Sequence, residues 1–175
     1  VSFLFFYKRL NEYDKHQFDD IKLTTFMFDG ERKHLLIENI KYIVWIWETW
    51  FDFHWSEKQD YEKVFINQKI FFEKQIFLAK RYSLPLIIHS RDAKEEVLSI
   101  LKENEFKNFI FHCFVEDLNY AYKAIYFSQE CKISFSWIVT YKSAKELQKV
   151  AANIPLDKII IETDCPYLAP QEVRW

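Results

Sequence analysis

The sequence predicts an α/β fold, a TIM-type (β/α) barrel, and three observations support this prediction. Short apolar runs alternate with amphipathic helical stretches from residue 42 onward. Side chains that commonly bind metals follow these runs: Glu48, His89, His112 and Asp164. In parallel βα units the carboxyl ends of the strands meet on one face, which is the active-site face of such barrels.

The apolar periodicity predicts each element in turn. Residues 42–47 and 85–88 are expected to be strands, and residues 61–82 between them carry a helical stripe that includes Phe65, Phe72 and Ile76. Pro85 is expected to begin its strand, where a missing N–H does least harm. The next helix is predicted over residues 92–103, with Asp92 as N-cap and Glu95 completing a capping box.

The second half of the chain repeats this alternation. Residues 108–111 and 131–135 are predicted strands, separated by a helix over residues 117–128 that Asp117 opens. A further helix is predicted over residues 143–152, where Ser143 and Glu146 form a second capping-box pattern. Pro155 precedes the last predicted strand, residues 158–161, and five strands separated by helices imply a parallel sheet.

The length of the chain limits how much of a barrel it can form. A complete eight-fold barrel takes about 200 residues or more, so 175 residues predict one domain with an incomplete barrel that lacks its amino-terminal strands. The first 40 residues contain no motif that we can assign, and neither a membrane span nor a signal peptide is expected there. We therefore expect a single partial domain over residues 1–175, with residues 1–40 unassigned.

Charge and cysteine content narrow the function classes. The net charge is −2 and the pI is near 6.2, which does not fit a protein that binds nucleic acid through a broad basic surface. The three cysteines, Cys113, Cys131 and Cys165, lack C-x-x-C spacing and cannot all pair, which favours the reducing cytoplasm. We expect no membrane association and no obligate protein partner.

The four metal-binding side chains favour a divalent metal centre. Any one of them alone would more often be a structural histidine or a loop cap. Four at the same end of successive βα units make a functional cluster the better interpretation. Mixed imidazole and carboxylate ligands suit Mg, Mn or Zn without choosing among them.

Two segments at predicted strand ends are LPLIIHSRDA at residues 84–93 and HCF at residues 112–114. They resemble the P-x-I-I-H-S-R-D-A and H-C-F motifs of the TatD family of metal-dependent deoxyribonucleases. IPLD at residues 154–157 and ETDCPYLAP at residues 162–170 are similar to its I-P-L-D and E-T-D-x-P-Y-L-A-P motifs. WETWFD at residues 47–52 is similar to its G-E-x-G-L-D. The resemblance covers roughly residues 41 to 175.

The resemblance implies a site and an activity. Glu48, His89, His112 and Asp164 would hold two divalent metal ions, with Glu48 and Asp164 also catalytic, while Arg91 would contact substrate and Glu162 would support the ligands or contact substrate. The implied reaction is hydrolysis of phosphodiester bonds in DNA, with single-stranded DNA as substrate and an exonuclease mode. Two alternatives remain open: a hydrolase of the same barrel superfamily acting on a lactone, ester or amide, and an inactive fragment. For Arg91, a surface salt bridge is the alternative to a bidentate phosphate contact.

The chain departs from the family pattern in two places. The family's first strand carries an H-x-H pair that completes one metal position, whereas His16, His34 and His54 are isolated here. Val115 and Glu116 stand where the family usually has serine and glycine, which affects a turn beside the site.

A further departure concerns glycine, because the chain has one glycine and six tryptophans. Trp47, Trp50, Trp137 and Trp175 stand at positions where the family pattern has glycine. A gene that uses UGA for glycine would yield this sequence if UGA were translated as tryptophan; the alternative is that the tryptophans are genuine. Glycine positions permit positive φ or close backbone approach, so we expect Trp47, Trp50 and Trp137 in or beside the metal site with strained backbone or crowded packing.

Overall fold

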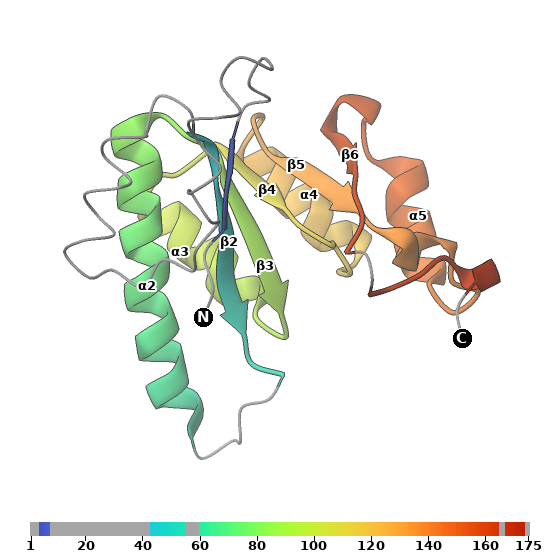
Figure 1. Ribbon diagram of the computed structural model, residues 1–175, viewed down its shortest axis with the longest axis horizontal. Helices are drawn as coiled ribbons and strands as arrows, with labels where there is room; N and C mark the ends of the chain where they lie inside the picture. Colours follow the sequence, from blue (N-terminus) through green and yellow to red (C-terminus); the bar gives the residue numbers. More distant parts are fainter. Residues whose placement is uncertain (1–3, 8–42, 55–59, 165–166, 174–175) are drawn as a thin grey trace, which may run out of the picture.

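The described strands form one sheet whose spatial order follows the chain. The computed structural model describes residues 4–7, 43–54, 60–164 and 167–173 (Figure 1). Its strands are β1 (Leu4–Tyr7), β2 (Ile43–Asp52), β3 (Leu86–Arg91), β4 (Phe109–Phe111), β5 (Lys132–Phe135) and β6 (Ile159–Ile161). Strands β2 to β6 are parallel, whereas β1 pairs with β2 in the antiparallel direction.

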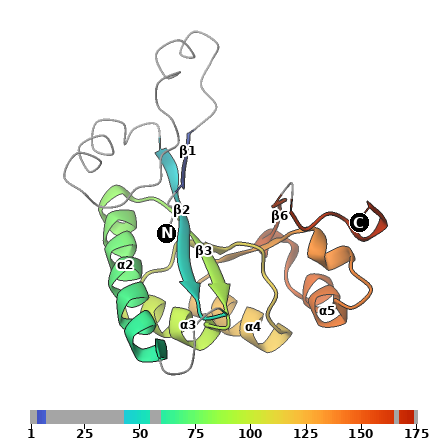
Figure 2. The ribbon, with the colours of Figure 1, turned by 60° about the horizontal axis from the view of Figure 1, so that its bottom comes forward.

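A helix connects each pair of successive parallel strands up to β6. These helices are α2 (Tyr61–Tyr82), α3 (Lys94–Glu103), α4 (Leu118–Phe127) and α5 (Lys145–Asn153). Short 3-10 helices add Trp137–Thr140, Leu156–Lys158 and Gln171–Val173. Figure 2 shows the four α-helices on one side of the sheet, as βα units of one hand require. The described strands thus form an open, incomplete TIM-type (β/α) barrel, as predicted.

The hydrophobic core lies between the helices and the outer face of this sheet. On β3, Leu86 and Ile88 are fully buried in the same apolar cluster as Phe72 of α2 and Leu101 of α3. Successive strand residues point to opposite faces, so Ile87 faces the other way. Burying each of these side chains stabilises the fold by about 1.5–3 kcal/mol. Because the buried positions recur regularly along the chain, the spacing of apolar residues was enough to locate the helices and strands.

The inner face of the sheet borders a cavity of about 230 Å³. Residues from five neighbouring strands line it, together with His112 and Glu162: Trp45, Ile87, Ile110, Ser134 and Ile160. Two polar residues identified in the sequence, His112 and Glu162, therefore line this cavity at the inner face of the sheet.

Two strands are longer than predicted. The parallel pairing of β2 with β3 continues from Thr49 opposite Ile88 to Asp52 opposite Arg91, beyond the predicted ends at residues 47 and 88. Glu48 and His89 consequently lie inside strands instead of after them. Pro85 lies just before β3, and its carbonyl accepts a hydrogen bond from the Ile46 amide at 3.0 Å.

The predicted helix caps are correct in one case of three. The Asp117 side chain accepts a hydrogen bond from the Tyr120 amide and caps α4 as predicted. The Asp92 prediction is wrong: α3 begins after Ala93, while Asp92 adopts a positive φ of 54° and its carboxylate contacts the His54 ring at 3.0 Å. The Ser143 prediction is also wrong, because Ala144 takes the N-cap position of α5 without a side-chain hydrogen bond.

Strand β1 was missed by the sequence analysis. Its LFFY run is too short to distinguish from other apolar segments, and only pairing with β2, from Leu4 opposite Trp47 to Tyr7 opposite Ile43, makes it a strand. His16 and His34 lie outside the described residues, and the single-domain organisation over residues 1–175 stays a prediction. Within the part of the chain that the structure describes, no helix is long and apolar enough to cross a membrane.

Candidate metal centre

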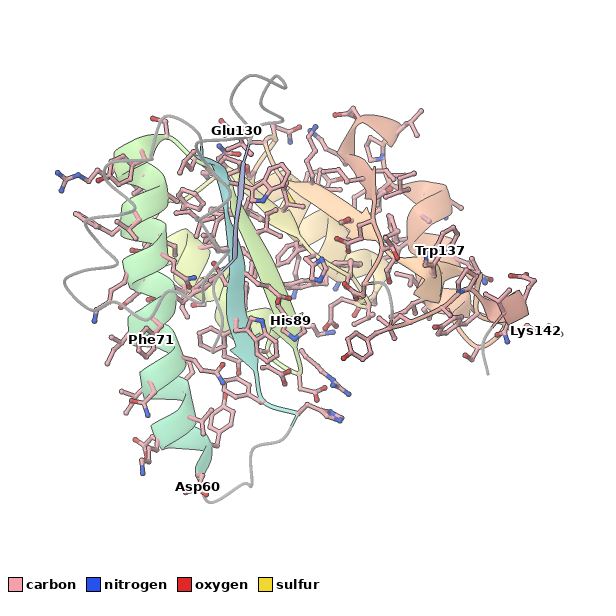
Figure 3. The ribbon with its side chains drawn as sticks, in the orientation of Figure 1. Asp60, Phe71, His89, Glu130, Trp137 and Lys142 are labelled. Atoms are coloured by element: carbon pink, nitrogen blue, oxygen red, sulfur yellow. The ribbon has the colours of Figure 1, made fainter. Side chains whose placement is uncertain are left out.

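The structure brings the four predicted side chains together at one end of the parallel strands. Glu48 lies in β2, His89 in β3, His112 directly after β4, and Asp164 after β6. Glu48 Oε1 is 3.3 Å from His89 Nδ1 and 3.5 Å from His112 Nε2. His112 Nε2 is also 3.1 Å from Asp164 Oδ1. Figure 3 shows His89 among the side chains gathered at this end of β2 and β3.

Each imidazole also contacts a second, outer carboxylate through its other ring nitrogen. His89 Nε2 is 3.3 Å from Asp52 Oδ2, and His112 Nδ1 is 2.5 Å from Glu162 Oε2. The Glu162 carboxylate also accepts a hydrogen bond from the Cys113 backbone amide. Both rings are therefore held between Glu48 on one side and an outer carboxylate on the other.

Asp52 is the site residue that sequence reasoning missed. It lies in the segment that resembles the family's G-E-x-G-L-D, yet no role was assigned to it. The available signal was its spacing, because residues separated by an even number along a strand point to the same face, and Asp52 follows Glu48 at that period. The signal was hidden because the predicted strand ended at residue 47.

The surroundings shift the pKa values of Glu48 and His112 in opposite directions. Burial raises the pKa of Glu48, but hydrogen bonds from His89 and Trp50 and the charges of both histidines outweigh it, so the net pKa is lowered. Burial lowers the pKa of His112, but the hydrogen bond to Glu162 and the charges of Glu162, Glu48 and Asp164 raise it overall. The metal-free cluster therefore favours the ionised form of Glu48 and the protonated form of His112.

The side chains of this cluster are of the types that bind divalent metals, although here they contact one another directly. Neutral imidazoles and carboxylates are ordinary ligands for Zn, Mn or Mg. Among the described residues, no three or more His, Cys, Asp or Glu side chains are arranged around a position where they could hold a metal ion. Glu48 instead contacts His89 Nδ1 and His112 Nε2, and Asp164 contacts His112 Nε2. Binding a metal therefore requires both carboxylates to separate from the rings, and it requires His112 to be unprotonated.

The described cysteines do not join the donor set. Cys113 follows His112 with a positive φ of 45°, and its Sγ is 3.2 Å from Ser136 Oγ. Burial is the main cause that raises the pKa of Cys113 to about 12, and burial likewise raises the pKa of Cys131 to about 12. Both thiols are therefore neutral at physiological pH, as a packing role requires, whereas metal ligation needs a thiolate. Cys165 lies outside the described residues.

Trp50 lies in the site, at one of the glycine positions of the family pattern. Its ring stacks on the His89 imidazole with centroids 4.6 Å apart and an interplanar angle of 19°, and its indole N–H donates to Glu48. Trp50 is still 39% exposed, so the indole covers His89 from the solvent side.

The expected backbone strain is not found at the described tryptophans. The non-glycine residues with positive φ in the described ranges are Ser83, Asp92, Glu105, Cys113 and Leu168. Trp50 and Trp137 therefore occupy conformations open to any residue. Trp137 is exposed and lies well apart from His89 in Figure 3. The side chain of Trp47 and the whole of Trp175 lie outside the described residues.

The structure also describes Arg91 and the two turn residues that depart from the family pattern, Val115 and Glu116. Arg91 ends β3 and is exposed, and its carbonyl accepts a hydrogen bond from the Phe53 amide at 3.0 Å. Glu116, at the family's glycine position, lies 3.3 Å from Lys94 Nζ, while Val115 beside it is exposed. The Glu116 carboxylate is thus stabilised by an ion pair with Lys94, the first residue of α3.

Comparisons with known proteins agree with this architecture. Among solved structures, the TatD homolog YJJV from Escherichia coli K12 superposes with a TM-score of 0.67 at 27% identity, covering 79% of this chain and 51% of that one. A TatD family hydrolase from Entamoeba histolytica superposes with a TM-score of 0.65 at 20% identity, covering 89% of this chain and 56% of that chain, which bears on the fold alone.

Curated relatives are described as metal-dependent hydrolases. One from Bacillus subtilis is 41% identical over 75% of this chain and 50% of its own length, and one from Mycoplasma pneumoniae is 38% identical over 81% and 54%. This chain therefore spans about half the length of the curated relatives it matches. The family model described as TatD related DNase matches residues 22–175. With these matches and the barrel architecture, the chain belongs to the TatD family of metal-dependent hydrolases.

Proposed function

We propose that this chain carries the metal-binding part of a deoxyribonuclease that hydrolyses phosphodiester bonds, with single-stranded DNA as its substrate and release of nucleotides from an end. The observation that carries the proposal is the convergence of Glu48, His89, His112 and Asp164 at the carboxyl ends of parallel strands. The family description as TatD related DNase supports the choice of DNA.

The contacts suggest a division of roles. Glu48 contacts both imidazoles, which supports a role in which it would serve two metal positions at once. His89 and His112 would hold one ion of Mg, Mn or Zn, and Asp164 would hold the other. Two bound ions would supply an activated water and neutralise charge on the phosphate oxygens.

The protein side chains would then manage protons and substrate. Asp164 lies at the edge of the cluster and would accept a proton from the attacking water on its carboxylate. The exposed guanidinium of Arg91 would bind a substrate phosphate through two parallel N–H groups, which fixes the phosphodiester relative to the carboxylates.

A hydrolysis assay with matched variants tests this function. The chain, expressed with the coding sequence that flanks it in its gene, is incubated with end-labelled single-stranded DNA and Mg²⁺ or Mn²⁺. Nucleotide release is expected, with loss of about 100-fold or more in Glu48→Ala and Asp164→Ala, because losing even an outer partner of a metal ligand typically costs 10–100-fold. Glu146→Ala is the matched control, since Glu146 is exposed on α5 and its ion pair within the described part of the chain is with Lys149, at 3.9 Å.

The same preparation distinguishes the competing functions. Cleavage of RNA but not DNA would change the substrate class, while hydrolysis of a lactone, ester or amide with intact DNA and RNA would replace the nuclease proposal. Full activity in Glu48→Ala would show that the cluster is not the catalytic site.

A further inference from the structure

Each oxygen of the buried Asp52 carboxylate has its own partner. Its carboxylate is only 7% exposed and accepts a hydrogen bond from the His54 amide at 2.8 Å through Oδ1. This leaves Oδ2 directed at His89 Nε2, 3.3 Å away. One oxygen is therefore anchored to the backbone while the other contacts the imidazole.

Helix α2 holds the backbone of Asp52 through a single side chain. The Gln68 carboxamide accepts from the Asp52 amide at 2.9 Å and donates to the Asp52 carbonyl at 2.8 Å. A glutamine that makes both bonds with one residue copies the pairing of a neighbouring strand. Gln68 thus satisfies the backbone at the end of β2 and fixes where the Asp52 carboxylate points.

We propose that Asp52, held by Gln68, is a positioning residue for His89. Asp52 accepts the Nε2–H of His89, which holds the ring with Nδ1 toward Glu48, where Nδ1 is the nitrogen that a metal ion would take. A neutral imidazole has one donor and one acceptor nitrogen, so the partner of the first selects the role of the second. This inference rests on the proposed function for its purpose, because an unprotonated Nδ1 is what a metal ion requires.

The His112 ring is arranged like the His89 ring, except that Nδ1 and Nε2 take each other's roles. His112 contacts the outer carboxylate of Glu162 through Nδ1 and faces Glu48 and Asp164 through Nε2. Histidines that bind metals commonly donate their other N–H to a carboxylate, which fixes the ring and its tautomer. Asp52 and Glu162 therefore play equivalent parts on the two sides of Glu48.

Nitrogen NMR of the metal-free protein tests the proposal independently of activity. Histidine labelled with ¹⁵N reports which ring nitrogen carries the proton, and His89→Gln identifies the signals of His89. At about pH 8 the Nε2 signal of His89 should be that of a nitrogen carrying its proton, which Asp52 accepts. Asp52→Ala should move this proton off Nε2, since Glu48 remains on the Nδ1 side, and Gln68→Ala should do so partially. Asp52→Asn should also do so partially, because its single amide oxygen cannot accept from both the His54 amide and His89.

Metal titration provides the second readout. Mn²⁺ affinity should fall about 10–100-fold in Asp52→Ala and by less in Asp52→Asn, whose one amide oxygen can still accept from His89 part of the time. Glu73→Gln is the control, because Glu73 lies on α2 with Gln68 and, among the described residues, forms an ion pair with Lys69 at 3.9 Å and none with the cluster. If Asp52→Ala does not fold, Asp52→Asn and Gln68→Ala still decide the question.

Two results would overturn the proposal: an unchanged Nε2 signal of His89 in a folded Asp52→Ala or Gln68→Ala protein, or an Nε2 that carries no proton in the wild type. Failure of the nuclease proposal looks different, because the Nε2 signal would then respond to Asp52 while DNA stays intact.

Discussion

Replacing Glu162 with alanine should destabilise the metal-free protein, because this carboxylate joins two segments that are distant in sequence. It accepts hydrogen bonds from the His112 ring and from the Cys113 backbone amide, both 49 or 50 residues earlier in the chain. The Cys113 amide belongs to a residue with positive φ, so the turn after β4 depends on an external partner.

The contacts set the size of the effect. A hydrogen bond to a charged group contributes about 1.5–3 kcal/mol, and leaving a buried donor without a partner adds to its loss. The Glu162 side chain is 21% exposed, so water partly replaces the carboxylate. We therefore expect Glu162→Ala to lower the free energy of unfolding by about 2–4 kcal/mol. Glu162→Gln should cost about half as much, because its amide oxygen can still accept from the Cys113 amide.

Urea denaturation of the metal-free chain at about pH 7 measures this change, since metal binding would otherwise add to stability. The backbone amide of Glu162 still donates to the Phe135 carbonyl at 3.1 Å, so pairing at the end of β6 should survive the substitution. The reasoning would be refuted if Glu162→Ala cost no more than about 0.5 kcal/mol, the range expected for a surface substitution such as Glu146→Ala.

Two further predictions concern a helix cap and the indole in the site. Asp117→Ala should cost about 0.5–2 kcal/mol, because the side chain caps α4 at the Tyr120 amide. The hydrogen bond from Tyr120, assisted by Lys94, lowers the pKa of Asp117 below 3.8, so this stabilisation is present above that pH and is lost as pH falls through the lowered value. Urea midpoints over an acid pH series check this, and an identical pH dependence in wild type and variant would contradict it. Trp50→Gly should raise Mn²⁺ affinity up to about tenfold by removing a ring stack worth about 0.5–1.5 kcal/mol from His89, whereas Trp50→Phe should not. Isothermal titration measures the change, and an unchanged or lower affinity would show that the indole does not obstruct the site.

The sequence was sufficient for the order of strands and helices and for the candidate ligands. The apolar period marked β2 to β6 and the helices between them because burial against one shared core imposes that period locally. His89, His112 and Asp164 were recognisable because each lies in a motif in or just after the carboxyl-terminal part of a strand, and parallel strands place such parts on one face.

The tertiary structure alone decided what depends on pairing between distant segments. β1 exists as a strand only through β2, and β2 extends to Asp52 only because β3 continues beside it. Asp92 failed as a cap because His54 attracts its carboxylate, and Asp52 became a site residue because Gln68 and His89 converge on it. These interactions join residues that are far apart in the chain, so neither periodicity nor local motifs carry a signal for them; they arise only when the sheet brings the segments together.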